Sequence, residues 1–193
     1  MCASTVNFAG LIYEMITKNK QISLRVLKNL AWVLKGMTDY ALFSNQDLKF
    51  VIKSATILFN TPGSEIKIDC LNIFKTYSDT RNEGILTMIA EASEKLIGCL
   101  TSNIDNCAVT GLCLRTICNL SSSENSQILK VMLNAGVLNA FYALLINSSP
   151  ITQKEVLWGL SNFAVDCKEV VQQIIQHEVL EKVADMAIAF DLN

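Results

Sequence analysis

The chain has 193 residues, of which 51% are hydrophobic and 18% charged, and its formal net charge is −2. This composition excludes a disordered chain, which would be rich in charge and poor in apolar residues. With 16 lysines and arginines against 18 aspartates and glutamates, it also excludes a general nucleic-acid binder, because no excess of cations is available to neutralise phosphates.

The N-terminal part carries no basic segment, since its first charged residue is Glu14. We therefore expect neither a secretory signal nor an Arg-rich transit peptide. The apolar spacing predicts a helix over about 6–16. We expect its apolar side chains Phe8, Leu11 and Ile12 to be poorly covered by the chain itself.

Almost all of the remaining chain predicts helix, because apolar residues recur at three- and four-residue spacing. The two prolines, Pro62 and Pro150, each lie in a short loop-like segment. The predicted fold class is all-α. Long helices are expected near 22–37, 65–78, 106–120 and 152–166.

These four long helices predict an internal repeat. When they are aligned, Trp32, Leu71, Arg115 and Trp158 fall at equivalent positions. A helical unit of about 40–44 residues is typical of armadillo and HEAT repeats. The prediction is a single armadillo-type superhelix over 1–193, with copies over 1–40, 41–80, 81–123 and 124–166 and a partial copy over 167–193.

The segment Val131–Gln153 contains no charged residue and has the length of a membrane span. Its several asparagines and serines would be costly in hydrocarbon. Two short helices broken at Gly136 explain the segment better. A short helix, a glycine turn, a second helix and then a long third helix together make a three-helix armadillo unit.

The third helix of this unit carries one polar-aromatic stripe. Trp158, Asn162 and Asp166 lie at i, i+4 and i+8, which keeps them on one face. Leu157, Leu160 and Phe163 are expected to point to the interior instead. We expect the stripe to lie on the concave surface of the repeat array, with the Trp158 ring partly exposed. After it, helices are expected over 169–176 and 179–189, with Val183 and Ile188 poorly covered.

The stretch Lys154–Asn162 resembles the third helix of an importin-α repeat, which runs Lys-Glu-x-x-Trp-x-x-Ser-Asn with an acidic residue four positions later. Asp166 supplies that acid. The turn Asn134–Leu138 also resembles the turn between the first and second helices of that family. The resemblance is specific over about 124–189 and weaker over 21–120.

The resemblance implies that the chain binds an extended basic peptide, such as a nuclear localisation signal. Tryptophans would stack on Lys and Arg stems, asparagines would bind the peptide main chain, and acids would pair with the cationic heads. Carried over by position, these roles fall on Trp158, Asn162 and Asp166. Further candidate positions in the other copies are Trp32, Arg115 and Asn119.

The other copies depart from the family pattern at the positions that would bind the peptide. Gly36 stands where the first copy should carry Asn, and Lys75 where the second should. In the third copy Arg115 replaces the tryptophan and Ser123 the acid. Cations at Arg115 and Lys75 would repel a basic peptide, so affinity for a Lys-rich signal should be weak.

The sequence gives little support to catalysis or to a cofactor or metal. The seven cysteines include no CxxC pair, so we interpret them as reduced, apolar groups of an intracellular protein. The only histidine, His177, falls in a predicted turn. The eight glycines are scattered and form no phosphate-binding loop.

Two functions from different classes remain. The first is a cargo adaptor for basic peptides, which would work in the cytoplasm and nucleus. The second is an armadillo scaffold subunit held permanently against neighbouring subunits of a larger assembly. The motif around Trp158 favours the first, and the apolar composition, Lys75 and Arg115 favour the second.

Overall fold

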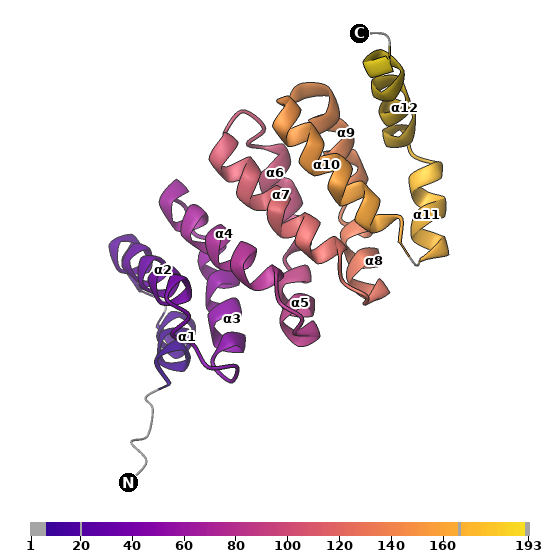
Figure 1. Ribbon diagram of the computed structural model, residues 1–193. Coiled ribbons are helices and arrows are strands. Elements are labelled where there is room, and N and C mark those ends of the chain that lie inside the picture. The colour runs from indigo at the N-terminus through magenta and orange to yellow at the C-terminus, as the bar shows by residue number, and fades with distance from the viewer. Residues whose placement is uncertain (1–6, 20, 166, 192–193) are drawn as a thin grey trace. The chain divides into compact units, whose positions relative to one another are not determined.

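The computed structural model describes residues 7–19, 21–165 and 167–191, and this part of the chain contains twelve helices and no strand (Figure 1). The all-α prediction is therefore confirmed. The helices are α1 (Phe8–Lys18), α2 (Leu24–Asp39), α3 (Leu48–Phe59), α4 (Ser64–Ser78), α5 (Glu83–Ala90), α6 (Ser93–Thr101), α7 (Cys107–Ser121), α8 (Ser126–Asn134), α9 (Val137–Asn147), α10 (Pro150–Phe163), α11 (Lys168–Ile175) and α12 (Glu178–Asp191).

The four long helices expected from the repeat are α2, α4, α7 and α10. Local signals explain where they begin. The side chains of Ser23, Asn106 and Ser149 each accept a hydrogen bond from a backbone N–H in the first turn of the helix that follows, as Ser and Asn do at N-caps. Pro150 is the first residue of α10, where its missing N–H costs nothing.

The predicted break at Gly136 is confirmed, because this residue separates α8 from α9 with φ = 86°, a left-handed conformation that favours glycine. None of the described helices is long and apolar enough to cross a membrane alone. Only α8 and α9 taken together have the required length and composition, and they are bent by 67° at this break.

The chain divides into two compact units, residues 1–77 and 78–193. In the first unit α1 packs against α3, and Phe59 of α3 meets Phe74 of α4 edge-on at a centroid distance of 5.8 Å. Phe8 and Leu11 are exposed as expected, but Ile12 is buried. The expectation for Ile12 was wrong because it lies on the side of α1 that faces α3.

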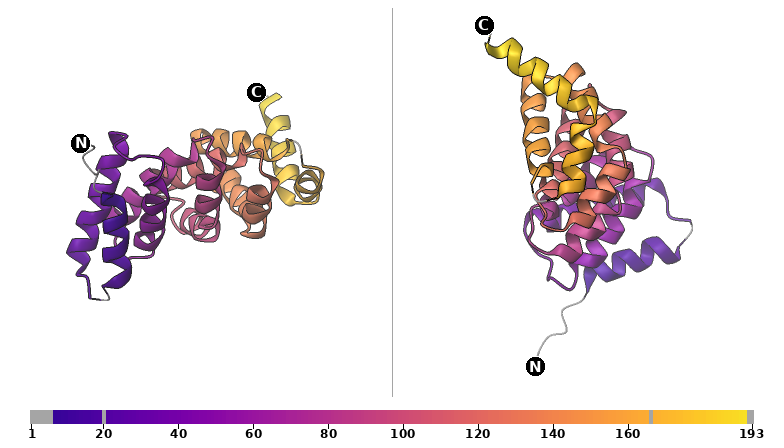
Figure 2. Two further views of the ribbon diagram at one scale, coloured as in Figure 1. Left: turned by 90° about the horizontal axis from the view of Figure 1, so that it is seen from below. Right: turned by 90° about the vertical axis from the view of Figure 1, so that its right-hand side faces the viewer.

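In the second unit, α5, α6 and α7 form one three-helix group, and α8, α9 and α10 form the next. α7 and α10 run side by side (Figures 1 and 2). Their core includes Phe141 and Phe163, which meet edge-on at 6.1 Å. Leu160 is also buried, as expected, whereas Leu157 is only half-buried.

The last two helices, α11 and α12, pack against α8 and α9 of the second unit and also form polar contacts with them. Lys130 of α8 pairs with Glu169 of α11 at 2.6 Å. His177 lies in the turn before α12, as expected. Its Nδ1 accepts the backbone N–H of Val179 at 3.0 Å, so its Nε2 carries the proton and donates to Asn139 Oδ1 at 2.9 Å. In α12, Val183 is half-buried and Ile188 exposed.

Candidate functional site

The structure brings four of the six predicted site residues together on α7 and α10. Arg115 and Asn119 lie one turn apart on α7, and Trp158 and Asn162 lie one turn apart on α10. Trp158 is 44% exposed, while both asparagines are half-buried. Trp158 is therefore partly exposed on the predicted stripe. Of the other two, Trp32 lies on α2 in the first unit, and Asp166 lies outside the described residues.

A glycine allows α7 and α10 to approach closely beneath this surface. A Cβ atom at Gly159 would lie 2.7 Å from Cys118 Sγ and 3.1 Å from Phe141 Cζ. The Cys118 thiol also donates to the carbonyl oxygen of Glu155 at 3.4 Å. The small residue next to Trp158 thus fixes how near the two helices stand.

Each asparagine reaches back to the preceding third helix. Asn162 Nδ2 donates to the carbonyl oxygen of Cys118 at 3.2 Å, and Asn119 Nδ2 donates to Ser78 Oγ at 3.0 Å. The two bonds span 44 and 41 residues of sequence, which is one repeat. The spacing of the sequence motif did not predict this role. Because an Asn amide carries two N–H donors and one acceptor, Asn162 commits only one of them to this contact.

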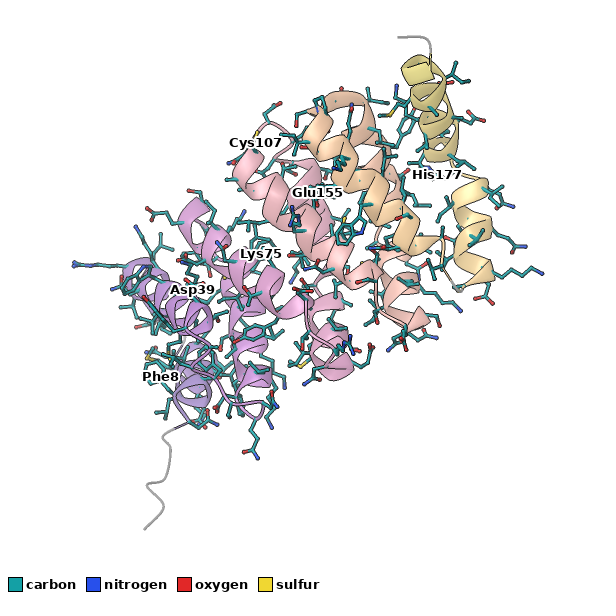
Figure 3. The ribbon with its side chains drawn as sticks, viewed as in Figure 1. Phe8, Asp39, Lys75, Cys107, Glu155 and His177 are labelled. Atoms are coloured by element: carbon teal, nitrogen blue, oxygen red, sulfur yellow. The ribbon has the colours of Figure 1, made fainter. Side chains whose placement is uncertain are left out.

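Arg115 is bound by a residue that the sequence analysis did not assign to it, Glu155 on the side of α10 that faces α7 (Figure 3). Arg115 Nε meets Glu155 Oε2 and Arg115 Nη2 meets Glu155 Oε1, both at 2.7 Å. The Arg115 side chain is 57% exposed and that of Glu155 is 26% exposed. A bidentate carboxylate offsets part of the Arg115 charge, so the repulsion of a basic peptide should be weaker than an unpaired arginine would cause.

An acidic hollow of about 580 Å³ lies within the second unit, lined by residues 78–86 and by residues at the carboxyl end of α7. Its lining includes Asp79, Glu83 and Glu124, against one cation, Arg81. The carboxyl end of α7 adds partial negative charge. Ser123, which stands where the family carries its acid, donates its hydroxyl to the Glu83 carboxylate at 3.2 Å. The carboxylate missing at this position is thus supplied by another part of the chain.

The alignment of α4 with the other third helices is wrong by one residue. Leu71 is fully buried, whereas Trp32 and Trp158 are exposed. The next residue, Asn72, is half-buried and is therefore the one that aligns with Trp32 and Trp158. Its Nδ2 donates to the carbonyl oxygen of Ile68 in the same helix at 2.9 Å. The corrected alignment also removes Lys75 from the position of the family asparagine.

Trp32 stands among paired charges in the first unit. It is 67% exposed, and on the same helix Lys35 and Asp39 form an ion pair at 2.6 Å. The hydrogen bond to Asp39 raises the pKa of Lys35 above its ordinary value. Burial raises the pKa of Asp69 on α4. Trp32 is thus accessible, but neither Asn nor an acid follows it at the spacing found after Trp158.

In the part of the chain that the structure describes, no group of three or more His, Cys, Asp or Glu side chains is placed to hold a metal ion. The described cysteines form no disulfide with one another. Burial raises the pKa values of Cys70 and Cys118. The chemistry that this surface offers is therefore that of an exposed indole, side-chain amides and paired charges.

No protein-family model matches the sequence, and no curated protein matches it. Solved structures do. A designed armadillo repeat protein in complex with the peptide (KR)4 is 18% identical over 90% of this chain and 72% of its own, with a TM-score of 0.72. A computationally designed armadillo repeat protein for modular peptide recognition is 15% identical over 91% of this chain and 72% of its own, with a TM-score of 0.73. The chain therefore has the armadillo repeat fold.

Proposed function

We propose that this protein is a non-enzymatic binding module that holds an extended basic peptide against α7 and α10. The observation that carries the proposal is Trp158, a large aromatic side chain that stays 44% exposed on the same face as Asn162. A tryptophan face attracts a cation and covers the CH₂ stem of Lys or Arg, a contact worth about 0.5–2 kcal/mol.

The surrounding polar groups suit the rest of such a peptide. The part of the Asn162 amide that Cys118 does not use can bond to a peptide unit. The acidic hollow, with Asp79, Glu83 and Glu124 against Arg81, suits cationic heads. The Arg115 charge is offset by Glu155, so it opposes a basic ligand less than an unpaired arginine would.

The likeness to a designed repeat protein that was solved with (KR)4 supports a peptide ligand for this fold. The resemblance of Lys154–Asn162 to importin-α extends the proposal to nuclear import. In that role the protein would be an adaptor that carries proteins with basic signals from the cytoplasm to the nucleus.

One observation favours a second candidate function, a scaffold subunit of a larger assembly. Several large apolar side chains on α1 and α12 are exposed, among them Phe8, Leu11, Leu180 and Ile188. Apolar surface of this kind is typical of places where another protein packs. In this case the partner would cover helix faces rather than lie along Trp158.

The test is a titration of a labelled Lys-rich peptide, followed by fluorescence anisotropy at two salt concentrations. Trp158→Ala should weaken binding by about 1–2 kcal/mol, or roughly five- to thirtyfold. Ile151→Ala is the matched control, because Ile151 is an apolar residue of the same helix that is 79% exposed. Its affinity should equal that of the unchanged protein.

Two outcomes would contradict the proposal. Tight binding that Trp158→Ala leaves unchanged would show that the peptide site lies elsewhere. A folded protein that binds no basic peptide, yet is recovered from its native extract with a stable partner, would favour the scaffold function.

A further inference from the structure

We infer that the peptide held by this surface has mixed charge, with an acidic side chain at Arg115 beside the basic one at Trp158. The inference rests on the proposed function and specifies the ligand of that same surface. It arises because Arg115 and Trp158 stand at equivalent positions of two neighbouring third helices, and their side chains offer opposite chemistry.

The ion pair leaves part of the Arg115 guanidinium for a ligand. Glu155 occupies the edge formed by Nε and Nη2. A guanidinium has five N–H donors in a rigid fork, so three donors are not used by Glu155. The edge formed by Nη1 and Nη2 has the geometry that binds a second carboxylate end-on. Because the Arg115 side chain is 57% exposed, a ligand can reach it.

Of the two paired side chains, Arg115 is the one that a ligand can contact. Both carboxylate oxygens of Glu155 are bonded to the guanidinium, and the Glu155 side chain is only 26% exposed. The pair orients the arginine in advance, so a bound carboxylate need not order it. Trp158 holds the equivalent position on the neighbouring helix α10, and residues at the end of α7 line the acidic hollow.

The spacing of the two charges in the ligand follows from helix geometry. Packed helices stand about 8–10 Å apart, and an extended chain advances about 3.3 Å per residue. The acidic residue of the ligand should therefore lie two or three positions from the basic residue over Trp158. A purely basic segment would place a cation against Arg115 instead.

The experiment compares peptides that share one fixed Lys and differ at a single position, which carries Glu, Gln or Lys. That position is moved from one to four residues on either side of the fixed Lys. At a spacing of two or three, the unchanged protein should bind the Glu peptide about three- to fivefold more tightly than the Gln peptide. The Lys peptide should bind most weakly, and these differences should shrink at high salt.

Arg115→Gln gives the sharpest result because it uncovers the Glu155 carboxylate. The order should then reverse, with the Lys peptide tightest and the Glu peptide weakest. The double variant Arg115→Gln/Glu155→Gln carries no charge at this position and should bind all three peptides equally. Circular dichroism confirms that each variant is folded.

The outcomes separate this inference from the proposed function. If the unchanged protein binds Glu, Gln and Lys peptides equally, or if Arg115→Gln keeps the original order, the mixed-charge ligand is wrong and peptide binding stands. If the folded protein binds none of these peptides, the proposed function fails, and this inference fails with it.

Discussion

Gly159→Ala tests whether the close approach of α7 and α10 fixes the surface that carries Trp158. In an open helical position the change from Gly to Ala stabilises a protein by about 0.5–1 kcal/mol. At Gly159 the new Cβ would lie 2.7 Å from Cys118 Sγ and 3.1 Å from Phe141 Cζ. Overpacking of this kind costs about 1–3 kcal/mol. The expected net effect is a loss of about 0.5–2 kcal/mol in the free energy of unfolding of the second unit.

Gly111→Ala is the matched control, because it lies on α7 and its Cβ would meet no atom within 4 Å. It should stabilise by about 0.5–1 kcal/mol. Urea unfolding followed by Trp158 fluorescence in a Trp32→Phe background reports the second unit alone. Trp32→Phe itself changes an exposed side chain of the first unit.

A double-variant cycle then locates the cause of the loss. Cys118→Ala removes the sulfur that the new Cβ would meet, so Gly159→Ala should cost about 1 kcal/mol less in that background. The reasoning is refuted if Gly159→Ala stabilises the second unit as Gly111→Ala does. It is also refuted if Cys118→Ala leaves the cost of Gly159→Ala unchanged.

Three further predictions concern single side chains. Burial raises the pKa of Cys118 to about 12, so at pH 8 this thiol stays protonated, and iodoacetamide should label the exposed Cys107 first, as mass spectrometry would show; early labelling of Cys118 would contradict its burial. Asn162→Ala removes the hydrogen bond to the Cys118 carbonyl oxygen and should lower the free energy of unfolding, measured in urea, by about 1 kcal/mol. An unchanged midpoint of urea unfolding would show that this hydrogen bond does not stabilise the protein. His177→Ala removes the acceptor for the Val179 N–H and should raise the hydrogen-exchange rate of the Val179 amide about fivefold. An unchanged exchange rate would show that His177 does not protect this amide.

Sequence patterns predicted the third helices because their signals are local. Ser23, Asn106 and Ser149 mark helix starts by bonding within their own first turns. The i, i+4 spacing likewise placed Arg115 with Asn119 and Trp158 with Asn162. In α4 the apolar residues are too dense to fix the register, since buried residues occupy 70, 71, 73 and 74. This is why the alignment of α4 was wrong by one residue.

Contacts between repeats could not be predicted in the same way. The pair of Arg115 with Glu155 joins residues 40 apart, and Ser123 reaches Glu83 across the same separation. Such partners depend on how one three-helix group packs on the next. The sequence shows the charged residues but not which of them meet. For that reason the sequence could not show that the charge of Arg115 is paired, since its partner Glu155 lies on another helix.

The two asparagines, Asn119 and Asn162, are weaker evidence for a ligand than Trp158. Asn162 and Asn119 each bond to the preceding third helix, so the fold alone accounts for an asparagine at both positions. A repeat without a ligand would keep them for that purpose. Trp158 is different, because the residue stays 44% exposed, so packing within the chain does not account for its size. The case for a peptide ligand therefore depends on Trp158 and on the charges around Arg115, and these are the residues that the binding experiments must change.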